Sequence, residues 1–148
     1  MKRICVNKKA RFQYEILDSF EAGLALRGTE VKSLREGRSS ITQSFGRIRG
    51  DELWLYGMDI PAYDAGSIYN HDPKRARKLL LHKREIKKLS DAASQKGFTI
   101  VPLSLYFKRG WAKVELALAR GKTTYDKRET MKRRESKREM ARIRGRKK

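Results

Sequence analysis

Four positive side chains lie within five residues of one another, directly after a proline. They are Lys74, Arg75, Arg77 and Lys78, and they follow Pro73. Cations on a turn held by proline can position a phosphate backbone without reading bases. A solvated charge cluster is the alternative, but the net charge of the whole chain is +20, which favours the phosphate contact. We therefore predict that these four residues are phosphate-binding candidates.

Aromatic and positive residues are interleaved in a second segment, residues 106–113. Splayed RNA bases stack on aromatic rings, so this pattern is typical of RNA contacts. By strand alternation, Phe107 is expected to face inward with Leu103 and Leu105. Tyr106 is then the better candidate for an RNA contact.

Catalytic chemistry has weaker support in the sequence. His71 and Asp72 are adjacent and could act as acid and base with Glu30 or His82, but adjacent residues on a strand point apart. Asp72 is better interpreted as a turn or cap residue. The single Cys5 and two histidines offer no set of ligands for a structural zinc. We expect a protein that is not an enzyme and has no cofactor.

Composition predicts a partner for this chain. Its 148 residues fit one domain, and 37 Lys and Arg stand against 17 Asp and Glu. This excess exceeds what solubility requires, so a polyanion is the expected partner. No apolar run is long enough to span a bilayer or to act as a secretory signal, so we expect a cytosolic protein without a membrane partner. We also expect a monomer.

The positive charge is concentrated at the C-terminus. Residues 120–148 hold 14 Lys and Arg against four Asp and Glu, and their few apolar residues form no continuous helical stripe. Such a segment cannot bury enough surface to offset its ordering entropy, although its residues are good helix formers. We predict that residues 121–148 form a basic tail that is disordered when free and helical when bound.

The preceding residues, 1–120, are expected to be mainly β with accessory helices. Alternation and turn residues predict strands at residues 14–26, 44–49, 53–58, 99–108 and 111–119. Helices are predicted at residues 28–37, with Thr29 as a possible cap, and at residues 83–96, before Gly97. About six short strands with interspersed helices indicate a closed antiparallel barrel of the oligonucleotide-binding type.

Three motifs give the chain a specific resemblance. They are Glu21-Ala22-Gly23 followed by residues 28–35 (GTEVKSLR), residues 72–82 (DPKRARKLLLH), and residues 125–129 (YDKRE). With these motifs in this order, the chain resembles the small protein B (SsrA-binding) family from about residue 7 to residue 134. The resemblance implies a barrel that binds the tRNA-like domain of tmRNA and delivers it to stalled ribosomes.

The resemblance also implies which barrel residues face tmRNA. They are Lys8, Lys9, Arg11, Glu30, Lys32, Ser33 and Arg35, with Tyr106 and Lys108 as further candidates. A carboxylate such as Glu30 can accept hydrogen bonds from base amino groups or a 2′-hydroxyl. Its alternative role is to stabilise the N-terminus of a helix.

The tail resembles the family segment that meets the decoding-centre rRNA of the ribosome. The residues concerned are Tyr125, Asp126, Lys127, Arg128, Lys132, Arg133 and Arg134. Tyr125 stands where some family members carry His, and both rings can stack on bases. A ribosomal or general structured-RNA-binding protein is the alternative function, and a ribonuclease is the third.

Overall fold

The strands and helices of this chain are described in a computed structural model for residues 2–63, 70–95 and 97–122. The strands are β1 (Lys2–Val6), β2 (Tyr14–Leu24), β3 (Phe45–Arg49), β4 (Glu52–Tyr56), β5 (Arg77–Leu80), β6 (Phe98–Lys108) and β7 (Trp111–Gly121). The helices are α1 (Ala10–Gln13), α2 (Gly28–Arg35) and α3 (Lys83–Ala93).

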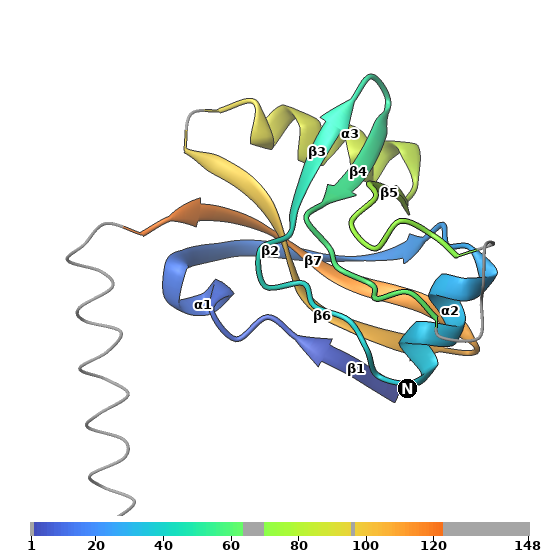
Figure 1. The fold of residues 1–148 in the computed structure, drawn as a ribbon. Helices are drawn as coiled ribbons and strands as arrows, with labels where there is room; N and C mark the ends of the chain where they lie inside the picture. The colour runs from blue at the N-terminus through green and yellow to red at the C-terminus, as the bar shows by residue number, and fades with distance from the viewer. Residues whose placement is uncertain (1, 64–69, 96, 123–148) are drawn as a thin grey trace, which may run out of the picture.

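The strand pairings join into a ring. Strand β3 pairs with β4, β4 with β5, β5 with β2, β2 with β7, β7 with β6, and β6 again with β3, all antiparallel. Strand β1 adds to the C-terminal half of β6 (Figure 1). The mainly β fold with accessory helices is confirmed, and the ring is the closed antiparallel barrel that the sequence predicts.

Apolar side chains from every strand of the ring fill its interior. Leu53 and Leu55 of β4 are fully buried, and the residues between and beside them point outward. Leu89 of α3 and Leu34 of α2 belong to the same core, so both helices close the barrel with apolar side chains. The period-two pattern of strands and the 3.6 period of helices explain why these positions were recognisable in the sequence.

Barrel closure depends on one close approach. Strands β3 and β6 pair at a single position, Gly46 with Ile100. A Cβ atom added at Gly46 would lie 2.8 Å from Cγ2 of Ile100, which is too close for any side chain. Glycine is therefore required where the two strands meet.

The sequence predicts that Leu103, Leu105 and Phe107 of β6 face the same side, and this is wrong for Leu103 because the strand contains a bulge. The pairing of β6 with β7 shifts register between Pro102 and Ser104. Because a bulge moves the following residues to the opposite face, Leu105 and Phe107 pack in the barrel core while Leu103 does not. Leu103 instead packs in a second cluster with Ala10 of α1.

Helix α2 begins differently from the prediction. Its N-cap is Arg27, whose backbone N–H donates to Oε1 of Glu30 at 2.8 Å, so Thr29 is not the cap. The hydroxyl of Thr29 is instead hydrogen-bonded to Nδ1 of His71 at 2.9 Å. The chain leaves this helix at Gly37, which has a φ of 75°.

Three elements lie outside the sequence predictions: β1, α1 and β5. Strand β5 has four residues, and its place comes from pairing with β4 on one side and β2 on the other. Helix α1 has only four residues, too few for a helical period to be recognised. None of the described helices is long and apolar enough to cross a membrane. The division at residue 120 stays a prediction.

Candidate nucleic-acid interface

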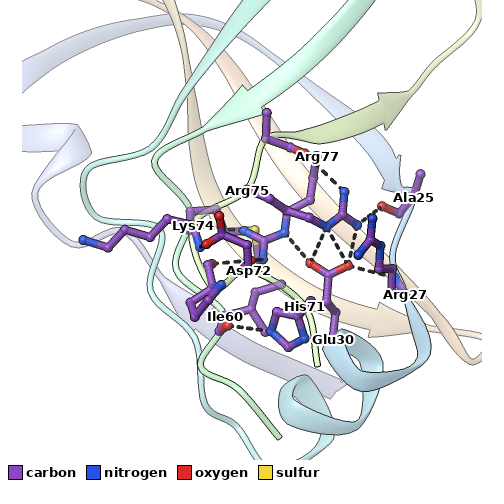
Figure 2. Close-up of polar contacts among 12 residues, drawn as sticks. Ala25, Arg27, Glu30, Ile60, His71, Asp72, Lys74, Arg75 and Arg77 are labelled. Carbon is purple, nitrogen blue, oxygen red and sulfur yellow. Dashed lines mark hydrogen bonds and ion pairs between the residues drawn. The ribbon is translucent and has the colours of Figure 1, made fainter. Parts of the chain in front are cut away.

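Helix α2 starts at a buried ionic cluster. The side chain of Glu30 is fully buried, and its carboxylate accepts hydrogen bonds from two arginines in the loop and strand that follow Pro73. Arg75 donates to both carboxylate oxygens, with Nε at 3.2 and 3.1 Å, and Arg77 donates through Nε at 2.6 Å. Figure 2 shows both guanidinium groups directed at this carboxylate. The cluster joins Glu30 to Arg75 and Arg77, which lie 45 and 47 positions further along the chain.

The guanidinium of Arg77 also satisfies backbone carbonyls. Nη1 donates to the carbonyl oxygen of Met58 at 2.7 Å, and Nη2 donates to that of Pro73 at 3.0 Å. A fully buried guanidinium needs such partners, because each unpaired donor in the interior costs free energy. Arg77 thus holds the loop after β4 and the loop before β5 against α2.

A second set of hydrogen bonds connects the same loops. His71 is buried, and its Nε2 atom lies 2.7 Å from the carbonyl oxygen of Ile60, opposite its contact with Thr29. Oδ1 of Asp72 accepts a hydrogen bond from the backbone N–H of Lys74 at 3.0 Å (Figure 2). Asp72 is therefore the turn residue that the sequence predicts, and His71 has a structural role.

The electrostatics of the cluster favour an ionised Glu30. Burial alone would raise the pKa of Glu30, but hydrogen bonds from Arg75, the backbone of Arg27 and Arg77 outweigh burial and hold this pKa below its ordinary value. Burial lowers the pKa of Arg77, and Glu30 opposes that change. Both groups remain charged near neutral pH.

Three of the predicted RNA contacts are fully buried. Glu30, Ser33 and Arg77 have no exposed surface, which argues against direct contact with RNA. Ser33 donates to the carbonyl oxygen of Pro61 at 2.6 Å. The alternative role of Glu30, at the first turn of the helix, is confirmed. Arg75 is only partly exposed and is occupied by Glu30.

The cluster leaves other predicted residues exposed. Lys32 and Arg35 project from α2, and Nζ of Lys32 lies 5.6 Å from the ring centroid of Tyr63. Lys74 is exposed on the turn, whereas Lys78 forms an ion pair with Glu52 at 2.6 Å. The predicted residues near α1 are also exposed; they are Lys8, Lys9 and Arg11. The structure therefore brings Lys32, Arg35 and Lys74 onto elements held by one buried cluster.

Tyr106, a predicted RNA contact, is buried. Only 7% of the residue is exposed, and its hydroxyl donates to Oε2 of Glu21 at 2.5 Å. Burial, followed by the hydrogen bond with Glu21, raises the pKa of Tyr106 well above its ordinary value. The tyrosine hydroxyl is the main reason that the pKa of Glu21 is lowered. Lys108 is exposed and pairs with the same carboxylate at 3.4 Å.

The exposed aromatic side chain near this strand pair is Trp111, which lines an apolar groove, rather than Tyr106. We name this groove the Trp111 groove, and its volume is about 470 Å³. Its lining includes Leu26, Val31, Leu80, Trp111 and Lys113. Trp111 is 72% exposed and Leu80 is 51% exposed, which is unusual for large apolar residues. The signal in the sequence was the position of Trp111 directly after the Arg109-Gly110 turn, where a side chain has few neighbours.

The Trp111 groove and α2 form one surface, because Val31 belongs to both. Gly23 also lines this groove. A Cβ atom at Gly23 would lie 3.4 Å from Cβ of Leu80 and 3.7 Å from Nζ of Lys113. The surface thus combines an indole ring, apolar side chains and several cations, which are the groups that bind unpaired bases and phosphates.

Three further predictions concern the tail, metal binding and the reactivity of Cys5. The tail residues from Tyr125 to Arg134 lie outside the described residues. Within residues 2–63, 70–95 and 97–122, no group of three or more His, Cys, Asp or Glu could hold a metal ion. Burial raises the pKa of the Cys5 thiol, which disfavours a reactive thiolate.

Comparison with known proteins gives consistent matches. The family model described as "SmpB protein" matches residues 4–146. An SsrA-binding protein of Trichodesmium erythraeum is 54% identical over 95% of this chain and 91% of its own length. Another, from Acidothermus cellulolyticus, is 57% identical over 98% of this chain and 91% of its own. A solved chain described as "tmRNA-SmpB: a journey to the center of the bacterial ribosome" is 54% identical, with a TM-score of 0.69 over 81% of this chain and 85% of its own.

Proposed function

This chain belongs to the SmpB family, and we propose that it binds the tRNA-like domain of tmRNA and delivers it to stalled ribosomes. The relatives are named for binding SsrA, and the similar solved chain is described with tmRNA and the bacterial ribosome. A protein with this function works in the cytoplasm. Its activity is binding and positioning rather than catalysis.

The observation that carries this proposal is the surface formed by the Trp111 groove and α2. Unpaired bases of a structured RNA can stack on Trp111 and contact Leu80, while Lys113 lies beside them. Lys32 and Arg35 on α2 extend the positive surface for the phosphate backbone. We assign this combined surface to tmRNA.

The buried cluster has a supporting role in this proposal. Glu30, Arg75 and Arg77 hold the N-terminus of α2 against the loops before and after it. Because preorganised groups lose less entropy on binding, the cluster would support RNA binding by holding the exposed residues in position. This explains how a motif that characterises the family can be buried.

The tail belongs to the same proposal as a separate ribosome-binding segment. Residues 121–148 would bind the decoding centre and the downstream message channel, with Tyr125 stacking on rRNA and the cations neutralising phosphates. The support for this part is the composition of the segment and its resemblance to the family.

The decisive experiment identifies the RNA that the protein selects. Full-length protein would be purified from its own cells under moderate salt, and the retained RNA sequenced. One RNA with a tRNA-like domain should dominate, and a competition assay should favour that domain over ordinary tRNA. Retention of many structured RNAs in proportion to their abundance would support a general RNA-binding protein instead. Cleavage of the RNA by the purified protein would support a ribonuclease.

A further inference from the structure

The outer face of the β3–β4 hairpin carries an alternating row of aromatic and guanidinium groups. Phe45, Arg47 and Arg49 project from β3, and Trp54 and Tyr56 project from β4. In the strand register, Phe45 is opposite Tyr56 and Arg47 is opposite Trp54. We name these five residues the hairpin ladder.

The members of the hairpin ladder stack on one another. The rings of Phe45 and Tyr56 lie 5.6 Å apart with 17° between their planes, and Cζ of Arg47 lies 5.6 and 6.0 Å from their centroids. Arg49 lies 5.5 Å from the ring centroid of Trp54, and its Nη1 donates to the hydroxyl of Tyr56 at 3.1 Å. These contacts hold the flexible arginines in place, which lowers the entropy cost of binding.

The two arginines of the hairpin ladder can still bind an anion. Arg47 and Arg49 are exposed and form no ion pair among the residues that the structure describes. Glu52, the acidic residue of β4, is already paired with Lys78 at 2.6 Å. A guanidinium plane can stack on a base while its N–H groups donate to phosphate oxygens.

A groove lies beside the ladder. Its volume is about 470 Å³, and Phe45 and Arg47 line it together with Ser90, Ala93 and Ser94. The groove exists because β3 and β6 pair only at Gly46 and Ile100, and because the facing side of α3 carries small residues. This volume is in the range of small-ligand sites and suits a nucleobase.

We propose that the hairpin ladder and this groove bind unpaired nucleotides of ribosomal RNA. Alternating rings and cations are suited to stacked bases joined by phosphates, and the two exposed arginines favour a polyanionic partner. The choice of ribosomal RNA rests on the proposed function, which places tmRNA on α2 and the Trp111 groove. None of the five ladder residues lies in α2 or lines the Trp111 groove, and the β3–β4 turn points away from α2 in Figure 1. We therefore expect the ladder to stay accessible when tmRNA is bound.

The test exchanges guanidinium for ammonium without changing net charge. The double variant Arg47→Lys/Arg49→Lys keeps both cations but loses the planar groups that stack and donate in pairs. Its matched control is Arg3→Lys/Arg84→Lys, at two exposed arginines outside the ladder and its groove. A second variant, Phe45→Leu, removes a ring of the ladder. The affinity of each full-length variant would be measured for purified small ribosomal subunits and, separately, for the tRNA-like domain of tmRNA.

We expect both ladder variants to bind ribosomal subunits about tenfold more weakly, as loss of a stacked base would cause. The control should bind like the parent protein, and all variants should keep parent affinity for the tRNA-like domain. Unchanged affinity of folded ladder variants for ribosomal subunits would overturn the inference. Weaker binding to the tRNA-like domain alone would assign the ladder to tmRNA and overturn its assignment to ribosomal RNA. The proposed function itself fails only if the parent protein does not select the tRNA-like domain.

Discussion

The Nε atom of Arg77 donates a hydrogen bond to Oε2 of Glu30 across 2.6 Å, and neither side chain is exposed to solvent. Removing the carboxylate would leave Arg77 buried without its counter-charge. We therefore expect Glu30→Gln to lower the free energy of unfolding by about 3 to 5 kcal/mol. Urea denaturation measures this change.

The matched control for that variant is Glu36→Gln. Glu36 pairs with Arg38 at 3.7 Å on the surface, with roughly half of each side chain exposed. Exposed pairs contribute between zero and about 1 kcal/mol, so this control should unfold close to the parent protein. Equal small losses in the two variants would show that the buried cluster does not hold α2 in place.

The pH dependence of stability should also report on Glu30. Its pKa is lower in the folded protein than the ordinary value of about 4.3. The ionised group thus stabilises the fold above about pH 4.3, and this contribution is lost as pH falls through the lowered folded pKa. The stability difference between the parent and Glu30→Gln should therefore narrow as pH falls below about 4. A difference that stayed constant down to the acid transition would contradict the lowered pKa.

Helix α2 provides the test of phosphate contacts. Reversing the exposed Lys32 and Arg35 to Glu should weaken binding to the tRNA-like domain and make its salt dependence shallower by about two counterions. The control is Arg84→Glu/Lys87→Glu on α3, which makes the same change in net charge at exposed positions. Equal effects of the two double variants would mean that only overall charge matters.

Trp111 provides the test of base stacking. Because its side chain is 72% exposed, Trp111→Ala should change stability by less than about 0.5 kcal/mol. It should nevertheless reduce the free energy of binding to the tRNA-like domain by about 1 to 3 kcal/mol, whereas Trp111→Phe should retain most of the affinity. Titration of fluorescently labelled RNA measures the affinity of each variant, and urea denaturation measures its stability. Parent affinity in the alanine variant would exclude the Trp111 groove from the interface.

Deletion of residues 123–148 separates the two RNA partners that we propose. The truncated protein should bind the tRNA-like domain at near-parent strength, after allowance for lost long-range attraction, because the Trp111 groove and α2 remain. Peptide tagging on stalled ribosomes in a purified translation system should fail. Replacing Asp126, Lys127 and Arg128 with Ala tests the same idea with only one unit of net charge changed. Parallel loss of both activities would place the tail in the tmRNA interface.

Several features were predictable from the sequence because they depend on local patterns or on summed charge. Short runs of aromatic and branched residues bounded by turn signals located β3 and β4, and period-two alternation located most of β7. Leu89 with Ala93 defined the inner face of α3. The excess of Lys and Arg indicated a polyanionic partner without any knowledge of their positions. The ordered motifs from Glu21 onward indicated the family, and the comparisons confirm it.

Tertiary structure alone decided which charged and aromatic residues reach solvent. Glu30 and Arg77 are 47 positions apart, and only folding buries each against the other. Tyr106 is buried and its hydroxyl donates a hydrogen bond to Glu21 of another strand, while Trp111 remains exposed at a turn. A local pattern shows which residues share a face, but the exposure of that face depends on segments distant in sequence. For this reason the sequence predicted an RNA-binding surface, and the fold determined which residues form it.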